Sequence, residues 1–444
     1  MSGRRIQRVF VADRGEAALR VLRSARGAGM EVVVAVADED GEAVWPDEAD
    51  FSVFIPREDG VPWPSVDRVI AAAADAGCDA VHPGAGALQL RPDAPSRVHA
   101  ASMAFVGAGT RGRELGADRA ALRARCARLG LETVPGAGPF TDPALITAWV
   151  AGVGYPVLVK HARAAGVRRT VRANGAEELA VALDILLGQG PVFVERFVDG
   201  AREIEVPFLV DGHGEGVTLG DREICLRGGA DRLLVEAPAP GLSAGTRAAM
   251  REAVVRLAQD LGWTGLGLCR FLVTADGHPW LLAVRPGLQP GAAATEACLG
   301  VDLVDAELRL AEGDALGWSP ADIGPERVAL AIAARAAVAD ESRVEGILVD
   351  PGLRFDSAVV AGDLVVPGEA LGTLVATGPT RQAAVVRARA ALDTWPTVGV
   401  EPAVAAVVRL LEDPRFWRAP LDREAAAAVV ADEPPALDPA RVVD

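Results

Sequence analysis

The segment "GLCRFLVTADGHPWLLAVRPGLQPGAAATE", residues 267–296, contains two apolar runs separated by an Asp-Gly pair. An Asp-Gly pair between apolar runs is typical of a β-hairpin, so the segment predicts two antiparallel strands. A loop interrupted by proline and glycine follows, and a helix is expected to begin at Thr295 and Glu296. The polar residues within the predicted strands are Arg270 and Arg285. This hairpin therefore presents arginines where catalytic sites usually have carboxylates.

The chain before this hairpin alternates short β-branched runs with helices rich in alanine, leucine and arginine. Between residues 8 and 103 this alternation predicts a parallel sheet with crossover helices. Residues 111–130 are expected to form one helix that leads into a second unit. Further β-rich sections lie on both sides of the hairpin, so the sequence predicts an α/β fold.

Composition limits the classes of function. The 444 residues are enough for roughly two to four domains. A formal charge of −16 argues against nucleic acid and anionic membranes as partners, because both would repel such a surface. We find no apolar run of about 18 residues, no signal-peptide pattern and no C-x-x-C pair among the five cysteines. These features predict a cytoplasmic protein with reduced thiols and no zinc site.

Lysine is almost absent from this chain. Of its 45 basic residues 44 are arginine, and the one lysine is Lys160, at the end of the apolar run "GYPVLVK". Biotin and lipoate are normally attached to lysine, and a lysine that ends a strand cannot act as a swinging arm. We therefore expect no covalent biotin on this chain, so that any carrier would be a separate protein.

Several motifs, taken in order, resemble the biotin carboxylase family, the ATP-grasp component of acyl-CoA and pyruvate carboxylases. The resemblance runs from about residue 8 to residue 420 and is carried by "VADRGEAALRV", "AVHPGAGAL", "GYPVLVK", "VFVERFVDGAREIEVPFLVDGHGEGVTLGDRE", "VEAPAPGLS" and "LRFDSAVVAG". It implies an N-terminal pre-ATP-grasp domain at 1–103, a helical linker at 104–130, an ATP-grasp lid at 131–196, an ATP-grasp core at 197–326, a C-terminal β-rich subdomain at 327–431 and a disordered tail at 432–444.

The resemblance also implies a magnesium site on the hairpin, which this chain lacks. Family members make carboxyphosphate from ATP and bicarbonate, and Mg²⁺ neutralises the polyphosphate through hard oxygen ligands. Those ligands are a glutamate on each strand and an asparagine two residues beyond the second. The matching residues here are Arg270, Ala283 and Arg285. We therefore expect no metal and a pocket lined by guanidinium groups without acidic side chains.

Other family positions have changed as well. The bicarbonate-binding arginine and the glutamate base correspond to Gly287 and Gly291, which carry no titratable side chain. A histidine expected near the ribose is Glu203, the glycine-rich lid loop is "ARAAGVRR", and the family's His-Gln-Lys stretch corresponds to Ala230, Asp231 and Arg232.

Some family positions are retained. Lys160 matches a lysine that contacts ATP phosphates, and Arg119 stands where the family has a second lysine. With Arg270 and Arg285 these residues are expected to place four cations in one cleft, where ATP could bind without magnesium. The adenine-binding hinge corresponds to Glu195, Arg196 and Val198, and the bicarbonate and biotin sites retain Gln289 and Arg354.

These observations favour a non-catalytic protein, a pseudoenzyme that binds an anionic ligand or acts as a structural or regulatory partner in an acyl-CoA-carboxylase-type complex. The resemblance implies a homodimer, with a carboxyltransferase or a biotin carrier protein as possible partner. One alternative is an active biotin carboxylase whose metal ligands would come from Glu236, Glu205 or Asp231. A second alternative is an ATP-grasp ligase with another acyl acceptor.

Overall fold

The computed structural model describes most of the chain, namely residues 5–40, 43–57, 63–162, 170–229, 231–318 and 323–431. Three sequence predictions lie outside these residues. They concern the tail at 432–444, the lid loop at 163–169 and Ala230.

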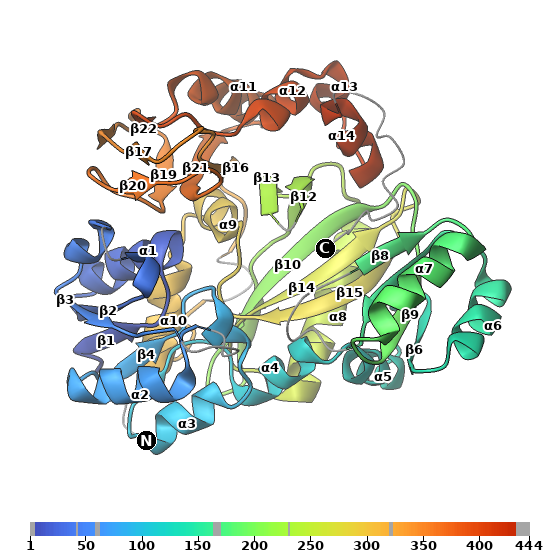
Figure 1. The fold of residues 1–444 in the computed structure, drawn as a ribbon, viewed down its shortest axis with the longest axis horizontal. Helices are drawn as coiled ribbons and strands as arrows, with labels where there is room; N and C mark the ends of the chain where they lie inside the picture. Colours follow the sequence, from blue (N-terminus) through green and yellow to red (C-terminus); the bar gives the residue numbers. More distant parts are fainter. Residues whose placement is uncertain are drawn as a thin grey trace.

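The N-terminal part is a parallel sheet with the strand order β3-β2-β1-β4-β5, as the alternating pattern predicted. Its strands are rich in valine and alanine because both faces are covered by helices (Figure 1). The elements are β1 (Arg8–Val11), α1 (Gly15–Gly27), β2 (Glu31–Val36), β3 (Phe51–Phe54), α2 (Val66–Asp75), β4 (Ala80–His82), α3 (Ala94–Ala100) and β5 (Ala104–Phe105).

The connection to the next unit is two helices, α4 (Thr110–Ala117) and α5 (Arg119–Arg128), so the prediction of one helix over residues 111–130 is wrong. The break lies at Asp118, whose backbone is extended with φ −121° and ψ 106°. Its carboxylate accepts a hydrogen bond of 2.9 Å from the backbone N–H of Ala121. Asp118 therefore caps α5, and this local bond competes with a continuous helix.

A four-stranded antiparallel sheet with the order β6-β9-β7-β8 forms the lid region, at the right of Figure 1. Its apolar face packs against two helices, and together they form a separate small core. The elements are β6 (Gly136–Phe140), α6 (Pro143–Val153), β7 (Val157–His161), β8 (Thr170–Ala173), α7 (Ala176–Leu187) and β9 (Val192–Arg196).

The largest sheet has nine strands and contains the predicted hairpin. Its order is β15-β14-β10-β12-β13-β16-β21-β19, with β11 paired to β10. Strand β13 of the predicted core pairs with β16 of the predicted C-terminal subdomain, so the sheet is continuous across the predicted boundary between them. The strands are β10 (Arg202–Val210), β11 (Gly216–Thr218), β12 (Arg222–Gly228), β13 (Asp231–Ala237), β14 (Gly265–Val273), β15 (Pro279–Pro286), β16 (Val328–Arg335), β19 (Arg354–Ser357) and β21 (Ala370–Gly378).

Three helices pack beside this sheet: α8 (Ala244–Leu261), α9 (Ala292–Leu299) and α10 (Leu303–Ala311). Helix α9 begins at Ala292, so its predicted start at Thr295 and Glu296 is wrong. Both residues are buried inside the helix, and Gly291, in the left-handed conformation, precedes its first turn.

The C-terminal region completes the large sheet and covers one of its faces with helices. Two short strand pairs, β17 with β20 and β18 with β22, lie beside it. The elements are β17 (Ser342–Arg343), β18 (Gly346–Ile347), β20 (Leu364–Val365), α11 (Arg381–Ala391), β22 (Thr397–Val398), α12 (Ala405–Glu412), α13 (Pro414–Arg418) and α14 (Arg423–Val430).

Within the described ranges, no helix is both long enough and apolar enough to cross a lipid bilayer. All five cysteines are free thiols in buried positions.

The cap at Asp118 gives a direct test of the helix break. Asp118→Ala removes the acceptor for the Ala121 N–H and should lower the free energy of unfolding by about 1 kcal/mol. Urea denaturation measures the loss. Glu114→Ala, at an exposed position of α4, is the matched control and should change stability by less than about 0.5 kcal/mol. Equal effects of the two substitutions would contradict the capping role.

Candidate functional site

Two carboxylates on the central strand β10 organise the region around the hairpin. Glu203 and Glu205 are two residues apart, so they lie on the same face of the sheet. In the antiparallel register Glu205 stands opposite Arg270 of β14 on one side and opposite Arg222 of β12 on the other. Both glutamates are essentially inaccessible, with exposed fractions of 2% and 0%.

Each of these glutamates is paired with arginines. Glu203 accepts hydrogen bonds from Arg227, at 2.7 and 2.9 Å, and from Arg270. Glu205 accepts from Arg222 Nε at 2.8 Å and from Arg232 Nη2 at 2.5 Å. The prediction of a guanidinium-lined pocket without acidic side chains is therefore wrong, because strand β10 places two carboxylates beside the arginines.

The arginines determine the ionisation of both glutamates. Burial by itself raises the pKa of a carboxyl group, but Arg270 and Arg227 outweigh it and hold the pKa of Glu203 far below its ordinary value. Arg232 and Arg222 likewise lower the pKa of Glu205 to about 2, against the effect of burial. Both side chains are thus charged at neutral pH.

Lys160 lies on β7 with its ammonium group against the carboxylate of Glu195 on β9. Both residues are buried. Arg123 of α5 approaches the same carboxylate, with Nη1 3.6 Å from Oε1. Burial lowers the pKa of Lys160, Glu195 opposes this shift, and the nearby charge of Arg119 reinforces it.

Arg119 differs from the other cations of this cluster. It lies near Glu195 and Arg270, since both influence its pKa, which burial lowers. Its Nε is buried and makes no hydrogen bond, and no described carboxylate lies within 4.0 Å of its guanidinium group. Lys160, Arg119 and Arg270 thus lie near enough to influence one another's pKa.

Arg285 contacts helix α4. Its Nη1 donates a hydrogen bond of 3.0 Å to the carbonyl oxygen of Gly116, in the last turn of that helix. A guanidinium group at a helix C-terminus interacts favourably with the helix dipole. This hydrogen bond joins the hairpin to α4.

The two glycines in the loop after the hairpin lie against side chains that fill the adjacent space. A Cβ atom on Gly287 would come within 2.5 Å of Gln89 Oε1, and Gly287 has a φ of +63°. A Cβ on Gly291, with φ +88°, would meet Val235 at 3.2 Å and the Arg222 guanidinium carbon at 3.5 Å. Larger residues at either position would therefore be strained.

The remaining predicted site residues lie in several different elements. Gln289 donates to the carbonyl groups of Pro286 and Leu288 and lines a cavity beside helix α9. Arg354 binds Asp356 and Glu296. Arg196 is exposed at the end of β9, and the carbonyl oxygen of Val198 accepts a hydrogen bond from Arg423.

The three carboxylates considered as alternative metal ligands are all paired with arginines. Glu205 binds Arg222 and Arg232, Glu236 binds Arg381, and Asp231 binds Arg335. Among the described residues, no three His, Cys, Asp or Glu side chains are grouped so that they could hold a metal ion.

Sequence reasoning missed the role of Glu205 and of the arginines on β12. A signal was present in the alternation of "REIEV" at 202–206, which places two acids on one face, and in the basic residues of "REICLR" at 222–227. The pairing of these two segments was not predictable, because it depends on the register of β10 with β12.

Removing one carboxylate tests the network. Glu205→Gln leaves Arg222 and Arg232 buried without their charge partner and should lower the free energy of unfolding at pH 7 by about 3–5 kcal/mol. The pKa of Glu205 is depressed to about 2, so its contribution is complete above the unfolded-state pKa of about 4.3 and is lost as the pH falls toward 2. The difference between variant and wild type should therefore shrink between about pH 5 and pH 2.

Urea denaturation at several pH values measures this difference. Glu252→Gln, at a largely exposed position of α8, is the control and should cost less than about 0.5 kcal/mol at every pH. A loss for Glu205→Gln that stays the same from pH 7 to pH 3 would contradict the assignment.

Comparisons with known proteins agree with this architecture. A sequence model described as "Biotin carboxylase, N-terminal domain" matches residues 5–111, and one described as "Carbamoyl-phosphate synthase L chain, ATP binding domain" matches residues 118–318. The biotin carboxylase of Nostoc sp. is 28% identical over 93% of this chain and 96% of its own length. The biotin-dependent acyl-coenzyme A carboxylase alpha3 subunit of Mycobacterium leprae is 30% identical over 92% of this chain and 72% of its own length.

A solved structure shows the same fold. The biotin carboxylase domain dimer of Hydrogenobacter thermophilus 2-oxoglutarate carboxylase, in complex with MgADP, ADP and bicarbonate, superposes with a TM-score of 0.88. It is 24% identical, and the match covers 97% of this chain and all of that domain. The fold, the ATP-grasp architecture and the relatives together lead to one conclusion: this chain belongs to the biotin carboxylase family.

Proposed function

We propose that this protein is a non-catalytic member of the family that binds an anionic ligand, such as the phosphates of a nucleotide, without a metal ion. The observation that carries the proposal is the position of Arg270. Arg270 lies on the hairpin strand β14, at the position where the resemblance places a metal-binding glutamate of the family. Its guanidinium group is bound to Glu203 of β10.

The hairpin residues do not fit a magnesium ion. Mg²⁺ requires oxygen ligands, and the three matching positions carry two guanidinium groups and one methyl group, at Arg270, Arg285 and Ala283. The nearest carboxylates, Glu203 and Glu205, are already neutralised by arginines. A dication placed here would meet positive charge first.

The steps that follow ATP cleavage also lack side chains. At Gly291, which matches the base that deprotonates bicarbonate, Arg222 lies 3.5 Å from where a Cβ would be. At Gly287, which matches the bicarbonate-binding arginine, Gln89 fills the adjacent space. General base catalysis needs a titratable group within reach of the proton, and neither glycine supplies one.

Anion binding is supported by an excess of basic side chains at this site. Among the described residues, three carboxylates (Glu195, Glu203 and Glu205) face seven buried or half-buried basic side chains, namely Lys160, Arg119, Arg123, Arg222, Arg227, Arg232 and Arg270. Positive charge that is withdrawn from water and incompletely balanced is costly, so a site of this kind is stabilised by a ligand that brings negative charge. Arg119, which no described carboxylate neutralises, would be its first contact.

An active biotin carboxylase and an ATP-grasp ligase with another acceptor are the alternatives. Release of ADP that depends on bicarbonate and free biotin would establish the first. Release of ADP on addition of a different carboxylate and amine would establish the second.

We also propose an oligomeric state and partner proteins for this chain, based on its relatives. The Hydrogenobacter thermophilus domain is described as a dimer, and the Mycobacterium leprae relative is one subunit of an acyl-coenzyme A carboxylase. A homodimer that associates with a carboxyltransferase or a biotin carrier protein agrees with both. Light scattering of the purified protein, alone and with a carboxyltransferase encoded by the same genome, would test it.

Calorimetry tests metal-free anion binding directly. Titration with ATP or ADP in EDTA should show binding that weakens with salt and that does not strengthen when magnesium is added. Arg119→Gln should weaken it by about tenfold or more, because one charge-assisted contact contributes about 1.5–3 kcal/mol. Arg128→Gln, at a largely exposed position of the same helix, is the control and should leave affinity unchanged. Absence of heat at millimolar nucleotide would overturn the nucleotide proposal.

Restoring single family residues should not restore turnover. Arg270→Glu supplies one metal ligand but leaves Ala283, Gly287 and Gly291 as they are, and it places a third acid beside Glu203 and Glu205. We expect no bicarbonate-dependent release of ADP above that of the wild type, together with lower stability. Recovery of bicarbonate-dependent turnover by this single substitution would contradict the proposed loss of catalysis.

A further inference from the structure

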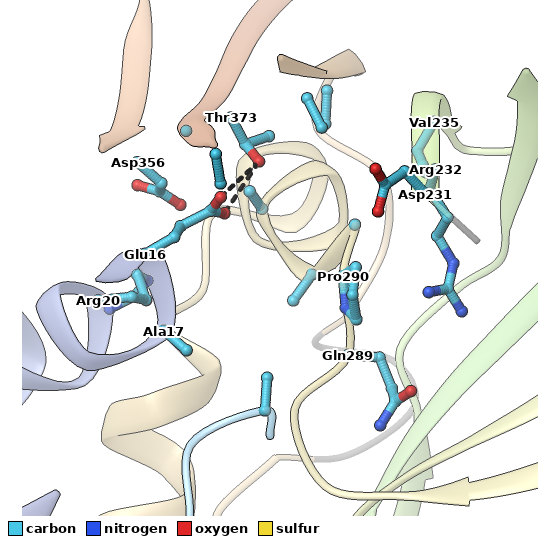
Figure 2. Close-up of a pocket in the computed structure, with 18 of the residues that line it drawn as sticks. Glu16, Ala17, Arg20, Asp231, Arg232, Val235, Gln289, Pro290, Asp356 and Thr373 are labelled. Atoms are coloured by element: carbon cyan, nitrogen blue, oxygen red, sulfur yellow. Dashed lines mark hydrogen bonds between the residues drawn. The ribbon is translucent and has the colours of Figure 1, made fainter. Parts of the chain in front are cut away.

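A cavity of about 270 Å³ lies where the N-terminal helix α1 meets helix α9 and strands β13, β16, β19 and β21 (Figure 2). Its wall is mainly hydrocarbon, contributed by Ala17, Ala85, Leu233, Val235, Leu288, Ala292, Ala293, Ala331, Ala333 and Ala334. Exposed residues, among them Pro290 and Arg335, also line it, so the cavity reaches the surface. Drug-sized ligands occupy pockets of roughly 300–1,000 Å³, so this one suits a smaller molecule.

Nearly all charged side chains on the cavity wall are ion-paired within the protein. Arg20 binds Glu296 at 2.7 Å, Arg232 binds Glu205, Asp231 binds Arg335 at 2.5 Å, and Asp356 binds Arg354 at 2.6 Å. These pairs leave little charge for a ligand to neutralise.

Glu16 is the exception among the described wall residues. Its carboxylate accepts hydrogen bonds of 2.9 and 3.1 Å from the Thr373 hydroxyl, which Figure 2 draws as dashed lines, and it has no basic partner within 4.0 Å. Burial raises its pKa to about 7, and the carboxylate of Asp356 adds to the shift. Arg354 and Arg23 lower the pKa, but they do not outweigh burial and Asp356.

We propose that this cavity binds a small organic cation, a protonated amine on a mainly apolar body, whose ammonium group pairs with the carboxylate of Glu16. The hydrocarbon body would lie against the alanine, valine and leucine side chains. An anion would be repelled by the carboxylate of Glu16, and a purely apolar ligand would remove water from Glu16 without replacing it. An ammonium group satisfies the carboxylate and also reduces its repulsion from Asp356.

This inference does not depend on the proposed function. The proposed anion site lies around Lys160 and Arg119, whereas the proposed cation site is the cavity wall at Glu16. Arg232 lines this cavity but is bound to Glu205, so its charge is already neutralised. The two sites can therefore be tested separately.

Calorimetry without nucleotide at pH 8, with hexylammonium and its near-isostere 1-hexanol, tests the proposal on the full chain. Hexylammonium should bind at least about tenfold more tightly than hexanol, because only the ammonium carries charge. Between pH 8 and pH 6 its affinity should fall by about tenfold, since Glu16 becomes protonated below a pKa of about 7.

Glu16→Gln should reduce the preference for the ammonium over the alcohol to less than about twofold, with circular dichroism and melting temperature confirming the fold. Glu252→Gln, which removes an exposed carboxylate elsewhere, should leave the preference intact and controls for general attraction to this acidic protein. Ala292→Phe, which fills the cavity, should weaken both ligands. Arg119→Gln, which is expected to weaken nucleotide binding, should bind hexylammonium as tightly as the wild type. The outcome of the nucleotide titration therefore does not decide the outcome of the hexylammonium titration.

Three outcomes would overturn the proposal. They are absence of hexylammonium binding at millimolar concentration, equal affinity for ammonium and alcohol, and a Glu16→Gln variant that keeps the wild-type preference.

Discussion

The pairing of Glu205 with arginines from the neighbouring strands is the interaction on which the central region depends. A fully buried carboxylate is tolerated only where opposite charge and hydrogen bonds replace water, and Arg222 and Arg232 supply both. Glu203 repeats the arrangement two residues earlier, with Arg227 and Arg270. Strands β10, β12, β13 and β14 are thereby joined by charge as well as by backbone hydrogen bonds. The network also determines the charge of this face of the sheet. Both carboxylates are paired with arginines, and the arginines outnumber the carboxylates among these residues.

A cluster of basic side chains lies beside this network, where the lid strands meet helix α5. Lys160 and Glu195 come from adjacent lid strands, and Arg119 and Arg123 come from the first turns of the helix that leads into the lid. Glu195 neutralises one charge, whereas several cations surround it. The result is a cluster of basic side chains with fewer carboxylates among the described residues, which is the basis of the proposed binding of an anion. Arginine suits this role because its charge persists even where burial lowers its pKa.

The basic cluster and the cavity at Glu16 carry opposite charge. On the side of the hairpin the excess is positive, and on the side of helix α1 the carboxylate of Glu16 has no basic partner among the described residues. The loop after the hairpin lies between them, and its glycines allow Gln89 and Arg222 to pack closely against it. At Gly287 and Gly291 a larger residue would meet these side chains, since Gln89 and Arg222 fill the space beside the two glycines.

Much of this protein was determined by the sequence alone. The alternation of apolar strands and helices predicted the parallel N-terminal sheet, and the Asp-Gly turn predicted the hairpin, because both depend on local periodicity and turn chemistry. The ordered motifs identified the family, and residue identities alone showed that the hairpin offers arginines. The break at Asp118 and the start of α9 at Ala292 were missed, since a capping bond and a left-handed glycine decide them. Only the tertiary structure decided that Glu203 neutralises Arg270, that Arg285 reaches α4, and that Glu16, in a cavity, has no ion pair among the described residues. These facts depend on the register between strands distant in sequence and on the packing of three sheets, which no local pattern specifies.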